Sequence, residues 1–289
     1  MKTLLKSFIM AYIYFSICYS QVIYQTTPVN KISFLYGLQD KKYESHYNGY
    51  NIVKTHDIAD SSENVYSLII SRNNSVKFRT KIGVDDSSRV NYVLYPLIPN
   101  GRKQIIIEEH TGGAHCCHLY WILDLGDTIR ILYHSNENET EIGALMWIFD
   151  YDNDGYYEFS QYLNSFHYFD KLSGANSPGA VAVYKYSKKL GIYVLANSDY
   201  PNENLERIEY TKSSVKEILD STKEFDSEDS ENLLSKTLEV LIDYIYAGQE
   251  NTGWLYFDSN YVLPDKIEMK EKIRSVLKAS VVYKEMYNK

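Results

Sequence analysis

The sequence predicts an α+β fold in which a repeat-derived antiparallel β region, either a sandwich or an open, propeller-like sheet, precedes a C-terminal helical region. Short apolar runs separated by turn residues fill 66–196, and part of that region repeats, with Gly101 aligned to Gly155. After about residue 203, apolar residues recur three and four apart. We therefore expect a signal peptide at 1–20, a β domain with two blade-like repeats at 21–200, and an α-helical region at 201–289 packed on the β domain.

Residues 1–20 have the pattern of a cleaved secretory signal peptide. Lys2 and Lys6 give a positive start, an apolar run follows through Ile17, and Cys18 and Ser20 are the small residues before a cut after Ser20. The run is short for a membrane anchor, and the bulky Ile17 before Cys18 disfavours a lipoprotein. The pattern predicts a secreted or periplasmic protein with no membrane span in the mature chain.

Composition narrows the range of partners. The chain has 289 residues and a formal net charge of −8, which becomes about −10 once the two lysines of the signal peptide are removed. An acidic protein of this kind is not expected to bind nucleic acid. The 29 tyrosines are consistent with a sugar-binding surface, but tyrosine also suits half-buried strands. We expect an unknown protein or glycan ligand.

Strands are expected wherever short apolar-rich runs lie between turn signals. Residues 21–60 give little pattern beyond one run, and the β pattern becomes clear at Tyr66. Turn residues at 72–75, at Gly126-Asp127 and near Gly191 predict hairpins. The expected strands are 32–38, 66–70, 76–81, 91–97, 104–108, 119–125, 129–133, 144–149, 156–162, 181–186 and 192–196.

The internal repeat places Gly101 over Gly155. In that register the first copy keeps the turn but loses the carboxylates, because Pro96 replaces Asp150, Ile98 replaces Asp152 and Asn100 replaces Asp154. Only the second copy is expected to hold a cation. Two such units cannot close a propeller, which is why a sandwich or an open, curved sheet is expected.

The C-terminal region predicts helices joined by short polar segments. Residues 224–230 form an acidic linker or helix cap, and Gly248 is a natural helix stop. Residues 254–257 are expected to pack the helices onto the sheet. The expected helices are 205–220, 231–247 and a last one that Pro264 opens and that runs to about Tyr287.

The acidic loop within 147–159 carries the clearest chemical signal. Three carboxylates alternate before Gly155, and a fourth acidic residue follows. The predicted ligands of a hard cation are Asp150, Asp152, Asp154, the carbonyl of Tyr156, and Glu158. Gln161 stands where an EF-hand needs a bidentate glutamate, so a shorter loop between strands is a better match. We expect structural Ca²⁺; an ordinary acidic turn with no ion is the alternative.

A second cluster spans His110–His118 and includes the only two cysteines of the mature chain, Cys116 and Cys117. Four outcomes are open for it: a strained vicinal disulfide, buried reduced thiols, a metal site, or a catalytic Cys117 with a histidine base. The alternative site uses His110, His115, Cys117 and His118, with Zn²⁺ as the less favoured cofactor. In a regular strand each face would offer only two ligands, fewer than the four of a structural zinc site.

The run Thr-Gly-Gly-Ala-His-Cys-Cys at 111–117, followed by the Asp-x-Asp-x-Asp-Gly loop, resembles a group of uncharacterised exported bacterial proteins. Some of these are similar to the FG-GAP or VCBS-type repeats of β-propellers, whose acidic loops bind calcium. The resemblance covers about residues 90–195 and implies that the four acidic residues of the loop are calcium ligands. Pro96 and Ile98 depart from the pattern, so no such site is expected in the first copy.

These observations predict an exported, calcium-stabilised binding or cell-envelope module that is not an enzyme, with an unidentified ligand. No serine triad, zinc-protease helix or phosphate loop stands out in the sequence. The alternative is an exported metal- or thiol-dependent enzyme, hydrolase-like, centred on His110–His118.

Overall fold

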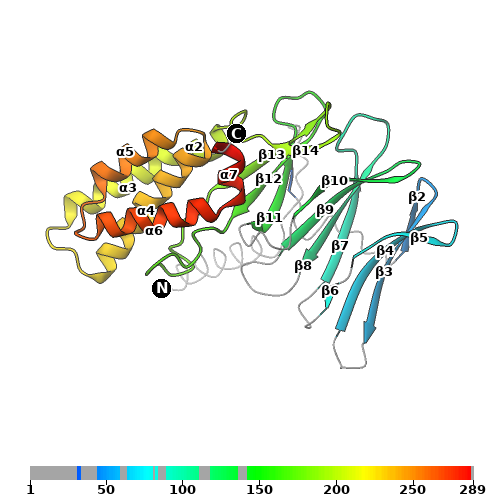
Figure 1. The fold of residues 1–289 in the computed structure, drawn as a ribbon, viewed down its shortest axis with the longest axis horizontal. Helices are drawn as coiled ribbons and strands as arrows, with labels where there is room; N and C mark the ends of the chain where they lie inside the picture. The colour runs from blue at the N-terminus through cyan, green and yellow to red at the C-terminus, as the bar shows by residue number, and fades with distance from the viewer. Residues whose placement is uncertain are drawn as a thin grey trace, which may run out of the picture.

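The computed structural model of this chain describes residues 31–33, 44–58, 64–80, 82–83, 89–110, 118–135 and 142–287. Three antiparallel sheets stand one beside another, and the helices lie beyond the third sheet (Figure 1). The predicted α+β fold, with a β region followed by a helical region, is confirmed.

The first sheet has the order β2-β3-β4-β5, and the short β6 also pairs with β4. Its strands are β2 (Glu44–Tyr47), β3 (Tyr50–Ile58), β4 (Asn64–Arg72), β5 (Ser75–Arg79) and β6 (Ile82–Gly83). The turn residues at 72–75 predicted the β4–β5 hairpin, whereas β2 and β3 were not predicted. Asn48 and Gly49 join those two strands with φ angles of 49° and 78°, the left-handed pair of a type I′ hairpin turn. The Asn-Gly signal was present in a stretch too polar to show a strand pattern.

The second sheet is also a meander, the third is a meander to which β1 adds at one edge, and their strands overlap the predicted runs. The second has the order β10-β9-β8-β7, and the third has the order β1-β11-β12-β13-β14. Their strands are β7 (Arg89–Tyr95), β8 (Gln104–His110), β9 (His118–Leu125), β10 (Ile129–His134), β1 (Lys31–Ser33), β11 (Ile142–Phe149), β12 (Glu158–Leu163), β13 (Val181–Ser187) and β14 (Ile192–Leu195). The predicted strand 32–38 overlaps β1; residues 34–38 lie outside the described part.

The second sheet is buried on both faces. Ile105 and Ile107 of β8 belong to a core shared with the first sheet, whereas Ile106 belongs to the core shared with the third sheet and the helices. Successive side chains of a strand point to opposite faces, so one continuous apolar run serves two cores. This order of layers explains why β8 shows no polar alternation.

The internal repeat matches the strand boundaries of the second and third sheets. When Gly101 is aligned with Gly155, β7 and β11 end at corresponding residues, and β8 and β12 begin at corresponding residues, Gln104 and Glu158. The two glycines lie in the corresponding loops with φ angles of 76° and 81°. These loops are therefore comparable positions of two similar strand pairs.

The helices are α2 (Asn202–Leu205), α3 (Ile208–Ser221), α4 (Ser227–Tyr246), α5 (Glu250–Asn260), α6 (Lys266–Ala279) and α7 (Val281–Tyr287). The acidic linker is a helix cap, because Asp226 accepts the N–H of Asp229 at the start of α4. Gly248, with φ 80°, follows the end of α4 as predicted. Two predictions need correction. The single helix after Pro264 is two helices, and residues 254–257 belong to α5, which packs on α4.

Ser280 separates the last two helices. Its backbone leaves the helical conformation, with φ −58° and ψ 128°, and its hydroxyl accepts the N–H of Tyr283 at 3.0 Å, which caps α7. The third sheet is contacted by α2, α4 and α7. Residues 1–20, with the predicted cleavage site, lie outside the described residues. Among the helices of the described part, none combines the length and apolar character needed to cross a membrane.

Candidate functional site

The acidic loop between β11 and β12 gathers three carboxylates. Asp150, Asp152 and Glu158 each place one oxygen so that all three oxygens lie within 4.8 Å of one another. Asp150 and Glu158 are buried, at 8% and 3% exposure, whereas Asp152 is exposed. Carboxylates this close repel one another unless a cation neutralises them, and oxygen donors are the ligands that Ca²⁺ prefers. The donor set fits a hard divalent cation.

Local hydrogen bonds explain the shape of this loop. Asp150 accepts the backbone N–H groups of Asp154 and Gly155, each at 3.1 Å. Glu158 accepts the N–H of Tyr151 at 3.0 Å. The φ of 81° at Gly155 is one that other residues adopt only at a cost, so glycine permits the bend. The sequence of the loop therefore holds Asp150 and Glu158 beside each other.

The pKa of Glu158 is raised by its surroundings in the cluster. Burial raises its pKa to about 7; the hydrogen bond from Tyr151 opposes this shift and the negative charge of Asp152 adds to it. At neutral pH a substantial fraction of Glu158 is therefore protonated when no cation is bound. A bound cation would favour the ionised form, because an opposite charge lowers the pKa of a carboxyl group.

Asp154 and Tyr156, two further predicted ligands, are placed differently. The carboxylate of Asp154 accepts the N–H of Tyr156 at 2.8 Å and lies 3.4 Å from the Nζ of Lys188. That ammonium also lies 3.9 Å from the centroid of the Tyr156 ring. Asp154 is thus not part of the group of three carboxylates, and its role as a ligand stays a prediction, as does that of the Tyr156 carbonyl.

The loop between β7 and β8 is an internal comparison for the acidic loop. Gln104 stands in the first copy of the repeat where Glu158 stands in the second, and its Oε1 accepts the N–H of Leu97 at 2.8 Å. Leu97 is the counterpart of Tyr151, whose N–H Glu158 accepts. The same side-chain-to-backbone hydrogen bond is therefore accepted by a neutral amide in one loop and by a carboxylate in the other.

A second bond repeats in the same way. Asn100 Oδ1 accepts the N–H of Arg102 at 3.0 Å, as Asp154 accepts that of Tyr156. The amide of Gln104 also donates toward Asn100 Oδ1, at 3.4 Å, and so supplies a donor inside the loop. The acidic loop has carboxylates at these positions. The two loops share a backbone shape, but only the acidic loop brings carboxylates close together.

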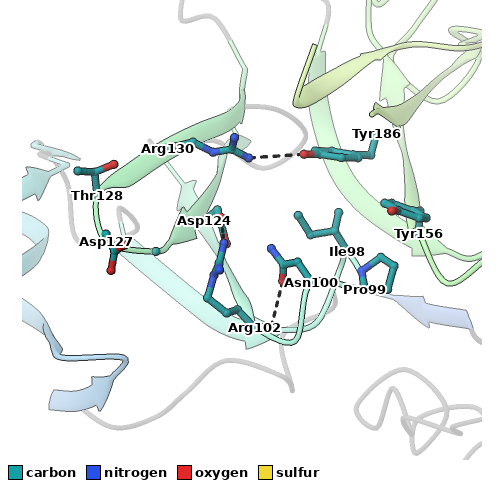
Figure 2. Close-up of a pocket in the computed structure, with 11 residues that line it drawn as sticks. Ile98, Pro99, Asn100, Arg102, Asp124, Asp127, Thr128, Arg130, Tyr156 and Tyr186 are labelled. Carbon is teal, nitrogen blue, oxygen red and sulfur yellow. Dashed lines mark hydrogen bonds and ion pairs between the residues drawn. The ribbon is translucent and has the colours of Figure 1, made fainter. Parts of the chain in front are cut away.

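A cleft lies between these two loops and the β9–β10 turn, with a volume of about 420 Å³ (Figure 2). The second and third sheets both contribute to it. The lining residues are Ile98, Pro99, Asn100, Arg102, Asp124, Gly126, Asp127, Thr128, Arg130, Tyr156 and Tyr186. A backbone hydrogen bond of 2.8 Å from the N–H of Tyr157 to the carbonyl of Leu97 ties the two loops together at its base. The cleft thus adjoins the acidic loop directly.

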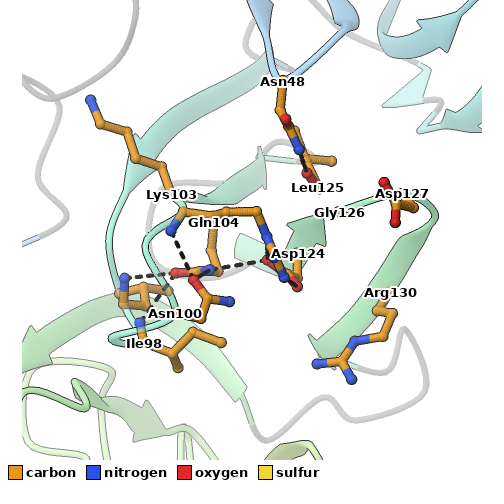
Figure 3. A network of polar contacts seen from close by, with 12 residues as sticks. Asn48, Ile98, Asn100, Lys103, Gln104, Asp124, Leu125, Gly126, Asp127 and Arg130 are labelled. Carbon is orange, nitrogen blue, oxygen red and sulfur yellow. Dashed lines mark hydrogen bonds and ion pairs between the residues drawn. The ribbon is translucent and has the colours of Figure 1, made fainter.

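Asp124 is the buried charge of this cleft. Arg102 lies 2.7 Å from one of its carboxylate oxygens, and the amide of Gln104 donates to the other at 3.1 Å (Figure 3). Burial alone would raise the pKa of Asp124, but the hydrogen bonds from Arg102 and Gln104 outweigh it, and the pKa is lowered. Asp124 therefore stays ionised, and both of its carboxylate oxygens accept hydrogen bonds from Arg102 and Gln104.

The alternative site is only partly described. His118 is buried, and its Nδ1 lies 2.9 Å from Glu108, which also accepts from the amide of Asn91 at 3.1 Å. His115, Cys116 and Cys117 lie outside the described residues, as does the side chain of His110. The disulfide, zinc and catalytic-thiol interpretations of this cluster therefore stay predictions.

Sequence reasoning did not identify the cleft. Its four charged residues stand outside any motif and come from strands or turns of one sheet, while Tyr186 comes from another; they are Arg102, Asp124, Asp127 and Arg130. The one available signal was the repeat, since Arg102 occupies the position of Tyr156 in the second copy. Comparisons with family models, with curated proteins and with solved structures find no match to this chain.

Proposed function

We propose that this protein is an exported, calcium-stabilised binding or cell-envelope module that is not an enzyme, and that its ligand, an unidentified protein or glycan, binds beside the calcium loop. The pattern of residues 1–20 supports export. The observation that carries the proposal is the convergence of the carboxylates of Asp150, Asp152 and Glu158 in a loop whose counterpart in the same chain replaces Glu158 with Gln104.

One residue of the predicted cation site, Tyr156, also lines the cleft. It belongs to the acidic loop and donates its N–H to Asp154. Calcium would neutralise the clustered carboxylates and hold the loop in one conformation. A binding role fits the cleft, because its one buried carboxylate, Asp124, is ionised and committed to Arg102 and Gln104. It is thus a poor general acid.

Calcium is expected to raise the Tm of the mature protein by about 5–10 °C. Ligand present at 100 times its Kd stabilises a protein by about 2.7 kcal/mol, and each kcal/mol shifts the Tm of a domain this size by about 2–4 °C. Calorimetry with 1 mM Ca²⁺, 1 mM Mg²⁺ or EDTA checks this, with native mass spectrometry to count bound ions. An unchanged Tm and no bound calcium would contradict the proposal.

The stability of the calcium-free protein is expected to fall as pH rises from about 5 to 8. The pKa of Glu158 is about 7 in the folded protein and near its ordinary value of 4.5 in the unfolded chain. Between these values the folded state holds the proton more tightly, so raising the pH withdraws about 2–3 kcal/mol of stability. Urea denaturation in EDTA at several pH values measures the slope.

Two controls isolate the source of this slope. In Glu158→Gln the side chain cannot ionise, so the slope between pH 5 and 8 should be much reduced. With calcium present the wild-type slope should also flatten, because the cation stabilises the ionised carboxylate. A slope that persists in Glu158→Gln would assign the effect to another group.

A further inference from the structure

We propose that the cleft between the two repeat loops binds a carboxylate-bearing sugar, a single uronic acid residue, whose carboxylate pairs with the guanidinium of Arg130. The inference rests on the proposed function, since it names the ligand class of the same binding module. Four features carry it: the charge left uncompensated in the cleft, its hydrogen-bonding groups, its apolar wall and its size.

Arg130 is the cation in the cleft that has no carboxylate partner among the described residues. Arg102 is committed to the buried Asp124, at 2.7 Å, so these two charges cancel. The guanidinium of Arg130, by contrast, makes no ion pair among the described residues; its closest polar partner there is the hydroxyl of Tyr186, at 3.5 Å (Figure 2). The carboxylate of Asp127 points in a different direction from Arg130 (Figure 3). An exposed guanidinium in a concave site is a ready partner for one carboxylate.

Hydrogen-bonding groups surround this cation. The Oδ1 of Asn100 accepts from Arg102 and Gln104, and its amide N–H₂ is directed at the carboxylate of Asp124, so Asn100 belongs to the internal hydrogen-bond network of the cleft. The hydroxyl groups of Thr128 and Tyr186 also line the cleft and both donate and accept. Sugar hydroxyls, which are donors and acceptors at once, match such a lining.

The opposite wall is apolar. Ile98 and Pro99 come from the first loop, Tyr156 comes from the acidic loop, and Tyr186 comes from β13 of the third sheet. The two tyrosine rings stack at a centroid distance of 5.8 Å, so each holds the other in place. A pyranose ring has an apolar C–H face that such a wall can cover while its hydroxyls face the polar side.

Size and charge select among anions. A volume of about 420 Å³ falls at the lower end of small-molecule sites and suits one or two sugar rings. Of the four charged residues that line the cleft, Arg102 and Asp124 pair with each other and Asp127 points in a different direction from Arg130, so the guanidinium of Arg130 is the group that matches one negative charge on a ligand. The chain as a whole carries −8, which repels polyanions such as polyphosphates and nucleic acids. A monoanionic sugar therefore fits better than a multiply charged ligand.

The test titrates the full mature chain in 1 mM Ca²⁺ with matched sugars, D-galacturonate against D-galactose and D-glucuronate against D-glucose. Each pair differs only in the carboxylate at C6. We expect one uronate to bind at least 10-fold more tightly than its neutral partner by calorimetry or NMR titration. Arg130→Gln should weaken uronate binding about 10- to 100-fold, because a charge-assisted contact is lost, and change the affinity for the neutral sugar less than 2-fold.

Two further variants serve as controls. Arg130→Lys should keep part of the preference for the uronate, since it retains the charge but not the planar fork. Lys103→Gln removes an exposed cation that points away from the cleft and should leave both affinities unchanged (Figure 3). Equal binding of a uronate and its neutral partner, an unchanged affinity in Arg130→Gln, or binding of neither uronate would overturn the inference.

These outcomes are separable from the proposed function. Calcium binding and the calcium-dependent Tm do not involve Arg130, so they can hold while the sugar inference fails. Tight binding of a neutral sugar at Tyr156 and Tyr186 would keep the module and change its ligand. Cleavage of a uronate oligosaccharide would confirm the ligand class and contradict the non-enzymatic role.

Discussion

Asp150→Asn is expected to weaken calcium binding about 100-fold and to remove most of the calcium-dependent rise in Tm. Asp150 is buried and belongs to the group of three carboxylates, so the substitution removes a charged ligand from a site whose affinity depends on ligand charge. Both oxygens of Asp150 also accept backbone N–H groups, from Asp154 and Gly155. Calorimetric titration of the EDTA-treated variant with Ca²⁺ gives the affinity.

Asp154→Asn is the matched control within the same loop. The carboxylate of Asp154 lies near Lys188 and outside the group of three, so its loss should weaken calcium binding less than about 10-fold. An equal loss in both variants would show that the loop rearranges on binding and recruits Asp154, as the spacing of the motif predicts. An unchanged affinity in Asp150→Asn would contradict the calcium site itself.

Arg207→Ala is expected to lower the free energy of unfolding by about 2–4 kcal/mol, because it leaves the fully buried Asp243 without its partner; solvent reaches the Arg207 side chain, which is 38% exposed, and keeps the loss below that of a fully buried pair. Asp243 on α4 has a side chain with 0% exposure, and Arg207 binds both of its oxygens, at 2.7 and 2.9 Å. The same guanidinium donates to the carbonyl of Gly179, just before β13. One side chain therefore connects the helical region to the third sheet.

Denaturation with urea measures this loss of stability, and two further variants serve as controls. Arg274→Ala breaks an exposed pair with Glu271 on α6 and should change stability by less than about 1 kcal/mol. The double variant Arg207→Met, Asp243→Leu should recover much of the loss, because the fully buried carboxylate of Asp243 is removed with its partner, while Glu239 keeps its pair with Lys236. Equal effects of Arg207→Ala and Arg274→Ala would show that the buried pair contributes no more than a surface pair.

Features that depend on neighbouring residues were predictable from the sequence. The hairpins at residues 72–75 and at Gly126 follow from turn residues between apolar runs, and both are present. The end of α4 follows from Gly248, and the two similar loops follow from the repeat. The acidic loop is local in the same sense, since the hydrogen bonds that shape it join residues no more than seven apart.

Other features were hidden because neighbouring residues do not decide them. The strands β2 and β3 contain many polar residues, half of β2 is exposed, and only Asn48-Gly49 marked their turn. The break at Ser280 interrupts a pattern that is helical on both sides. The chain leaves the helical conformation at Ser280 although no proline or glycine is present there to indicate a helix end.

By itself, the sequence determined the α+β class, the order of most strands and helices, and the gathering of carboxylates in the acidic loop. Local backbone preferences and short hydrogen-bonded turns are enough to specify these features. Only the tertiary structure decided which charges are compensated. Arg102 pairs with Asp124, Arg207 pairs with Asp243, and Arg130 keeps an exposed guanidinium in the cleft. These partners lie far apart in the chain, and they meet only because apolar burial packs the sheets and helices against one another.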